Sequence, residues 1–227
     1  SCFHGRFLNY EGFDESKFAN EISNDIGSQL NITNIEAEDF KKYIKDIIYY
    51  LDYPIVGPGS FPQFMVSKSV GKKLKVVLGG QGGDEIFCGY VRYLVPYLEK
   101  VINDSIGGDS EEKIKFIENI SVLQEYKPLI KKCWGEGLFG ELSKRYFKVL
   151  DRSDNLENII NWVKIDKHGI ENNYIEKFNN DKIPENDFFN KMMDFDLKYC
   201  LPALLQVEDR MSMAWGVESR VPFINHA

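Results

Sequence analysis

The chain has 227 residues, which is enough for one large domain or two small ones built around a buried core. Its formal net charge of −7 argues against a surface for nucleic acid or for an anionic membrane, because both carry negative charge themselves. No stretch has the roughly 18 uncharged apolar residues of a membrane-spanning helix, and the four scattered cysteines lack zinc-site or disulfide-scaffold spacing, so we expect a cytoplasmic protein with free thiols.

Helical and strand-like segments alternate from the start of the chain. Residues 14–27 predict an amphipathic helix, since they begin with a capping aspartate, repeat apolar residues at helical spacing and end at a glycine. Residues 30–32 predict a short strand. Thr33 and Glu36 have the spacing of a capping box, and the apolar stripe behind them predicts a helix over residues 36–51.

The same alternation continues up to residue 100. Ser60 with Pro62 predicts the start of another helix. Residues 75–78, Lys-Val-Val-Leu, form a short β-branched segment bounded by glycines and predict a strand, and a helix is expected to follow Gly83. Strands separated by helices are typical of a parallel sheet with right-handed crossovers. The predicted fold class is therefore α/β, a parallel sheet with flanking helices.

From about residue 100 the pattern becomes helical, with few strand signals. The sequence Gly107-Gly108-Asp109-Ser110 is a plausible boundary, and isoleucines recur at helical spacing soon after it. We therefore predict two parts, residues 1–105 as the α/β part and residues 106–227 as a mostly helical part.

A glycine-dense loop, residues 79–85, is the strongest chemical signal. It follows a predicted buried strand and leads into a helix that begins with Asp84 and Glu85. Glycines let a backbone approach a ligand closely, the amides of a helix N-terminus favour phosphate, and a carboxylate there can hold Mg²⁺. The alternative is a tight strand-to-helix turn whose carboxylates complement the helix dipole. The loop matches neither a Walker A motif nor the dinucleotide fingerprint, which disfavours a generic dinucleotide-binding domain.

Three ordered motifs resemble the C-terminal synthetase domain of glutamine-hydrolysing asparagine synthetases. The first is LGGQGGDEIFCGYVRY, residues 78–93, which matches a Gly-x-Gly-x-Asp-Glu loop followed by Phe-x-Gly-Tyr. The second, residues 201–214, contains an Asp-Arg-x-Ser-Met-Ala signature, and the third, residues 217–226, contains Glu-x-Arg-Val-Pro-Phe. Their order and separation also fit the family, so the resemblance spans nearly the whole chain.

The resemblance implies a fold, a reaction and partners. The fold would be a pyrophosphatase-type ATP-binding domain, similar to adenine nucleotide alpha hydrolases, with a nucleotide-binding part at residues 1–105 and a helical part of the same synthetase domain at 106–227. ATP and Mg²⁺ would activate aspartate, or a related small carboxylate, as β-aspartyl-AMP. Ammonia from a glutaminase domain absent here would then yield asparagine, as in amino-acid biosynthesis. A homodimer is one assembly that the resemblance leaves open.

The resemblance also assigns roles to the loop. Asp84 would be a Mg²⁺ ligand. The nucleotide would be bound through the backbone of four glycines, Gly79, Gly80, Gly82 and Gly83.

Two catalytic residues are expected from the resemblance. Gln81 stands where some members carry glutamate near the reaction intermediate, and Arg210 could meet pyrophosphate or the substrate carboxylate. For Arg210 an ion pair with Glu208 or Asp209 is an equally good interpretation. Arg220 is expected to hold the fold, because Arg-Val-Pro-Phe is typical of a packed turn.

Two parts of the family pattern are not in this sequence: the upstream Ser-Gly-Gly-x-Asp-Ser pyrophosphate loop and a downstream lysine segment. We therefore expect a fragment truncated at both ends, without its first strand, that is inactive alone. Two alternatives stay open. One is a related amidotransferase-type ligase with another carboxylate substrate, and the other is a degenerate, non-catalytic binding module.

Overall fold

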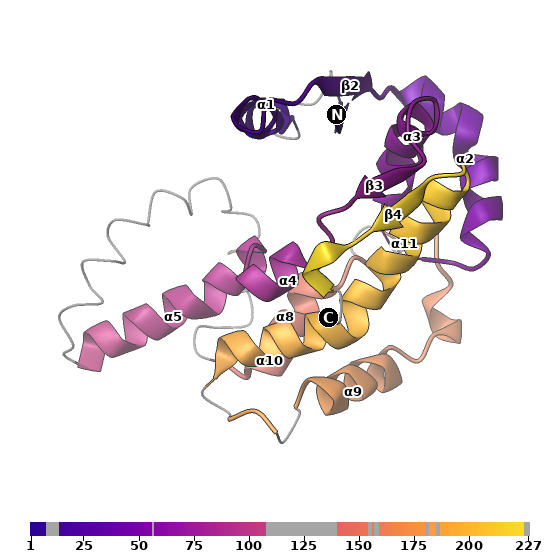
Figure 1. The fold of residues 1–227 in the computed structure, drawn as a ribbon. Coiled ribbons are helices and arrows are strands. Elements are labelled where there is room, and N and C mark those ends of the chain that lie inside the picture. Colours follow the sequence, from indigo (N-terminus) through magenta and orange to yellow (C-terminus); the bar gives the residue numbers. More distant parts are fainter. Residues whose placement is uncertain are drawn as a thin grey trace. The chain divides into compact units, whose positions relative to one another are not determined.

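The computed structural model of the chain (Figure 1) describes residues 1–7, 14–55, 57–107, 140–153, 156, 159–179, 182–184 and 187–224. It divides into two compact units. The first unit comprises Ser1–Gly82 and Cys200–Ala227, and the second comprises Gly83–Tyr199. This grouping differs from the division expected at residue 105, because the C-terminal helix and strand pack with the first unit.

The first unit contains two short parallel ladders. Strand β1 (Cys2–Arg6) pairs with β2 (Leu30–Asn34), and β3 (Val76–Leu78) pairs with β4 (Glu218–Arg220). The expected parallel pairing is thus confirmed for both predicted strand regions. Strand β4 was not predicted, and it lies beside β3 although about 140 residues separate them.

Helices α1 (Ser16–Asp25), α2 (Ala37–Leu51), α3 (Ser60–Gly71) and α11 (Leu201–Met213) complete the first unit. Helices α2, α3 and α11 enclose its core, in which Ile47, Phe64 and Met211 are almost fully buried. The ring of Phe64 also meets the ring of Trp215 at a centroid distance of 5.1 Å. Because α11 packs against both α2 and α3, the C-terminal motif is fixed to the N-terminal half of the chain.

Two helix-start predictions have different outcomes. The helix predicted at Ser60 is confirmed as α3. The capping box was expected between Thr33 and Glu36, but β2 runs through Thr33, and helix α2 begins one residue after Glu36. The backbone N–H of Glu36 instead donates to Asp39 at 3.2 Å, so the box is shifted by three residues.

The second unit is helical in its described residues. Its helices are α4 (Gly83–Phe87), α5 (Val91–Gly107), α8 (Leu142–Leu150), α9 (Lys167–Phe178) and α10 (Phe188–Phe195), with the 3-10 turn η2 (Trp162–Lys164). The π-helical turn η3 (Asp196–Cys200) follows α10. The single helix expected after Gly83 is interrupted at Cys88, whose φ of 57° leaves the right-handed helical region.

The coarse fold class is confirmed as α/β with small parallel sheets and a mostly helical later part. The boundary at residues 107–110 and the isoleucine helix after it lie almost entirely outside the described residues. Where the structure describes the chain, no helix is both long and apolar enough to cross a bilayer.

Candidate functional site

The glycine loop begins where strand β3 ends. The backbone N–H of Gly79 donates to the carbonyl of Arg220 at 2.8 Å, which extends the β3–β4 ladder by one residue into the loop. A Cβ atom on Gly79 would lie 2.8 Å from Oε1 of Glu208, so helix α11 leaves no room for a side chain there. Gly82 has a φ of 91°, and a Cβ on it would lie 2.7 Å from the side chain of Ile224. Packing and conformation therefore account for both glycines.

Gly80 is different from its neighbours in the loop. It is exposed, has no positive φ, and a Cβ placed on it would meet no atom within 4 Å among the described residues. Neither packing nor backbone conformation requires glycine at this position. The tight-turn interpretation therefore explains Gly79 and Gly82 but leaves Gly80 without a structural reason, whereas a close ligand approach would supply one.

A buried carboxylate, which the sequence did not assign to the site, lies against the loop. Glu208 on α11 is 6% exposed. Its Oε1 accepts a hydrogen bond from the hydroxyl of Ser219 on β4, and its Oε2 accepts one from the side-chain amide of Gln81 at 3.4 Å. The side chains of Gln81 and Glu208 thus come together from positions 127 residues apart.

These residues form one end of a cavity of about 660 Å³ in the first unit. Its lining residues come from the start of the chain with β1, the C-terminal end of α1, α3 and the turn after it, β3 with the glycine loop, and α11 with the segment that follows it. They are Ser1, Cys2, Phe3, Ile26, Gln63, Val66, Ser67, Val70, Leu74, Val76, Val77, Leu78, Gly79, Gly80, Gln81, Glu208 and Val217. The lining is apolar along β3 and becomes polar beyond its carboxyl end, at Gly79, Gly80, Gln81 and Glu208. Ligands of open parallel sheets bind at that end of the strands.

Charge limits what the cavity can accept. Among the described residues that line it there is no Lys, Arg or His side chain, and Glu208 is the one charged side chain. Phosphate oxygens need positive charge or converging N–H donors. The side chains of the described cavity wall therefore suit an uncharged or nitrogen-bearing ligand group. Phosphate groups would need backbone N–H donors or positively charged side chains in addition to them.

Asp84, the proposed metal ligand, is exposed in the first turn of α4 in the second unit. The backbone N–H of Gly89 donates to the carbonyl of Asp84 at 2.9 Å, and a Cβ on Gly89 would overlap the Asp84 carboxylate. The neighbouring Glu85 is 1% exposed and accepts a hydrogen bond from Tyr90 at 2.7 Å. No group of three His, Cys, Asp or Glu side chains suited to a metal ion occurs among the residues described.

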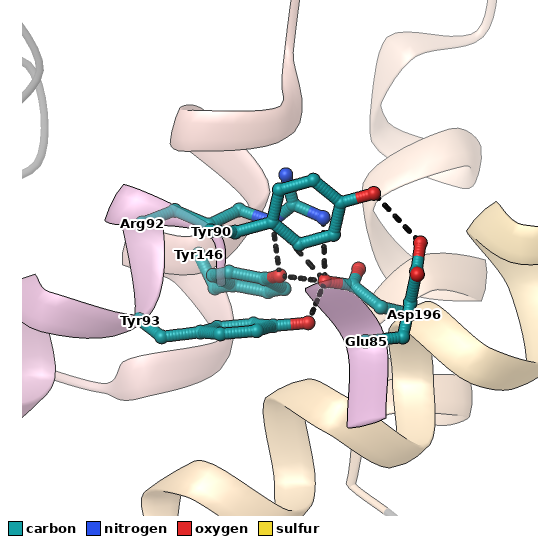
Figure 2. Close-up of polar contacts among 6 residues, drawn as sticks. All are labelled: Glu85, Tyr90, Arg92, Tyr93, Tyr146 and Asp196. Atoms are coloured by element: carbon teal, nitrogen blue, oxygen red, sulfur yellow. Dashed lines mark hydrogen bonds and ion pairs between the residues drawn. The ribbon is translucent and has the colours of Figure 1, made fainter. Parts of the chain in front are cut away.

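Asp196 anchors a buried polar cluster in the second unit, drawn in Figure 2. Its Oδ2 accepts hydrogen bonds from Arg92 at 2.6 and 3.1 Å, from the Tyr93 hydroxyl at 2.5 Å and from the Tyr146 hydroxyl at 2.6 Å. Its Oδ1 is buried and has no hydrogen-bond partner among the residues that the structure describes. Burial opposes the charge of Arg92, but the nearby Tyr146 and Asp196 raise its pKa. Burial and then Asp196 raise the pKa of both tyrosines.

Arg210 and Arg220 each form an ion pair with a residue outside the cavity lining. One of the two interpretations of Arg210, an ion pair with Glu208 or Asp209, is wrong, since Arg210 pairs with Asp52 across 3.3 Å and both side chains are about half exposed. Arg210 is not among the cavity-lining residues. Arg220 was expected in a packed turn, but it lies on strand β4, is exposed and pairs with Glu218 at 2.8 Å.

Comparison with known proteins gives consistent matches. The family model described as asparagine synthase matches residues 1–227. The chain is 36% identical over 104 residues to a putative glutamine-hydrolyzing asparagine synthetase of Mycobacterium tuberculosis (strain CDC 1551 / Oshkosh), covering 43% of this chain and 16% of that protein. It is 30% identical over 156 residues to asparagine synthetase 2 of Lotus japonicus, covering 66% and 25%. It is 24% identical over 170 residues to asparagine synthetase B of Escherichia coli (strain K12), covering 73% and 29%. Each alignment therefore spans less than a third of the relative.

Proposed function

Because the chain belongs to the asparagine synthase family, we propose that it is the ATP-using part of a carbon–nitrogen ligase that converts aspartate and ammonia into asparagine. The observation that carries this proposal is the polar end of the cavity, where Gly80, Gln81 and Glu208 meet beyond the carboxyl end of β3. That is the position at which an open parallel sheet binds its ligands.

We propose that the fold is the pyrophosphatase-type nucleotide-binding fold, in which the two ladders belong to one parallel sheet. Strands β1 and β3 each pair on one side only in the described residues, and residues of both line the apolar part of the same cavity. Unpaired strand edges expose backbone donors and acceptors, and parallel sheets are normally buried on both faces. One further parallel strand between β1 and β3 would satisfy these edges and leave the polar end for the ligand.

We propose nucleotide contact through the backbone of Gly79, Gly80, Gly82 and Gly83, with Gly80 the best supported of the four. Mg²⁺ is commonly held by one or two carboxylates together with substrate phosphates, so the single exposed carboxylate of Asp84 suits such a role. When bound, the ion would neutralise phosphate charge. Four expectations stay predictions: a glutaminase domain that supplies ammonia, a homodimer, a cytoplasmic location and a catalytic contribution from Arg210.

Gly80→Val tests the proposal, because a side chain there would block a ligand while its Cβ meets no atom of the described protein within 4 Å. The complete gene product should lose ATP binding, measured by calorimetry, by about tenfold or more, which corresponds to about 1.4 kcal/mol. Gly59→Val is the matched control, because a Cβ on Gly59 also meets nothing within 4 Å. Equal ATP affinities in the two variants, with both folded, would contradict a nucleotide site at Gly80.

A further inference from the structure

Glu208 is an unusual residue for a helix that packs into a core. The residue is only 6% exposed, and its carboxylate receives hydrogen bonds from two neutral groups, Ser219 and Gln81. No Lys, Arg or His in the described part of the chain pairs with it. Burying a carboxylate without a cation is costly, and such groups gather at functional sites. Glu208 also lines the cavity, so its carboxylate lies beside the space that a ligand would fill.

The carboxylate determines how Gln81 is oriented. A carboxylate accepts hydrogen bonds and donates none, so the NH₂ group of Gln81 is the part of the amide that turns toward Glu208. The carbonyl oxygen of the same amide then points away from Glu208. Ser219 holds the other carboxylate oxygen, which keeps the glutamate side chain in place. The pair therefore offers the amide oxygen of Gln81 as a hydrogen-bond acceptor beside the glycine loop.

We propose that Glu208 and Gln81 form a carboxylate–amide pair that recognises an N–H donor group of the ligand. In this pair Glu208 is the positioning residue, and Oε1 of Gln81 accepts the hydrogen bond from the ligand nitrogen. The charge of the cavity supports this assignment, because its one charged side chain is negative and disfavours phosphate. Three sources share the required chemistry: the amino group of adenine, the α-amino group of the amino acid, and ammonia.

This inference rests on the proposed function and makes a specific prediction for Glu208→Gln. The substitution keeps the size of the side chain, and with its amide oxygen on the Ser219 hydroxyl, its NH₂ group faces the NH₂ group of Gln81. To avoid facing two donors, the Gln81 amide rotates and turns its own NH₂ group toward the ligand. The NH₂ group of Gln81 then faces the N–H group of the ligand, and two donors cannot form a hydrogen bond. Gln81→Glu instead places two carboxylates against each other, while the exchanged pair, Gln81→Glu with Glu208→Gln, again has one carboxylate and one amide.

The experiment compares the wild type, both single variants and the exchanged pair in the complete gene product. Three arms separate the nitrogen sources: Kd for ATP and AMP, KM for aspartate and KM for ammonium. Inorganic pyrophosphate, which has no N–H group, is the ligand control. Glu218→Gln is the matched protein control, because Glu218 is exposed on β4 outside the cavity lining.

We expect each single variant to weaken one nitrogen-bearing ligand by about tenfold or more, as for the loss of one charge-supported hydrogen bond. Pyrophosphate binding should stay constant, and the exchanged pair should recover to within about threefold of wild type. Should Glu208→Gln fail to fold, Gln81→Met removes the acceptor from a half-exposed side chain and should cause the same loss.

The outcomes separate the two proposals. If the folded wild type binds neither ATP nor AMP, the proposed function is overturned. If the wild type binds nucleotide but Glu208→Gln and Gln81→Met leave all three nitrogen ligands unchanged, the carboxylate–amide pair alone is overturned. An equal loss of pyrophosphate binding, or an exchanged pair no better than the worse single variant, also contradicts the pair.

Discussion

Asp196→Asn should destabilise the protein far more than its modest change in shape suggests. The wild-type carboxylate is fully inaccessible and collects four hydrogen bonds on one oxygen, two from Arg92 and one each from Tyr93 and Tyr146 (Figure 2). The asparagine keeps an acceptor oxygen but loses the negative charge. The guanidinium of Arg92, whose side chain is only 17% exposed, is then left mostly buried without its anion.

The expected cost follows from the geometry. Breaking a buried ion pair by removing one partner costs about 3–5 kcal/mol, whereas losing one neutral hydrogen bond costs about 1 kcal/mol. Tyr93→Phe, which removes one neutral donor, should therefore cost about a third of the Asp196→Asn effect or less. For a chain of this length the larger loss corresponds to a fall in Tm of about 6–20 °C.

Urea denaturation followed by circular dichroism measures this free energy of unfolding. Asp194→Asn is the matched control, because Asp194 lies two residues away and its ion pair with Lys198 is partly exposed, and losing such an ion pair costs at most about 1 kcal/mol. Adding Arg92→Met to Asp196→Asn should recover part of the stability, because it removes the guanidinium charge that has lost its anion. If Asp196→Asn cost no more than Asp194→Asn, or if the double variant were simply additive, the buried ion pair would not have the role assigned to it.

Two further predictions concern pH and catalysis. Burial and then Asp196 raise the pKa of Tyr146, so the folded protein keeps a phenolic proton that the unfolded chain releases near pH 10. The stability from this proton is complete below about pH 10 and falls as pH rises above it; Tyr146→Phe should flatten that fall in urea midpoints, and an unchanged slope would contradict the assignment. The 227-residue chain alone should release no pyrophosphate above background from ATP, Mg²⁺ and aspartate, since no Lys, Arg or His side chain lines its cavity. Clear turnover in a coupled pyrophosphate assay would contradict this.

The local parts of the fold could be predicted because they depend on nearby residues. Helix α3 begins at its predicted serine, with a proline in its first turn, and β3 is a short β-branched run. Strand β4 was missed because Glu218–Arg220 has two charged residues among its three and becomes a strand only through pairing with β3. The break at Cys88 was also unpredictable, since a positive φ at a residue other than glycine is uncommon.

The carboxylate of the site was missed for a reason that helix geometry explains. Glu208 and Arg210 are two residues apart on α11, and residues at that spacing point to different sides of a helix. Glu208 instead shares its side with Met211 and Ser212, three and four residues later, which are both buried. A helical projection of this segment would have placed a glutamate on the buried side. Its contact with Gln81 could not have been found that way, because it depends on the tertiary fold.

The glycine loop has one sequence pattern but more than one physical cause. Gly79 and Gly82 are fixed by their neighbours, since side chains there would collide with Glu208 and Ile224. A substitution at either position disturbs packing, so a loss of activity would not distinguish a ligand contact from a folding defect. Gly80 and Gln81 are the informative positions, because the surrounding described residues leave space beside the first and orient the second. The ligand can therefore be identified through these two residues, with Glu208 as the group that determines what Gln81 offers it.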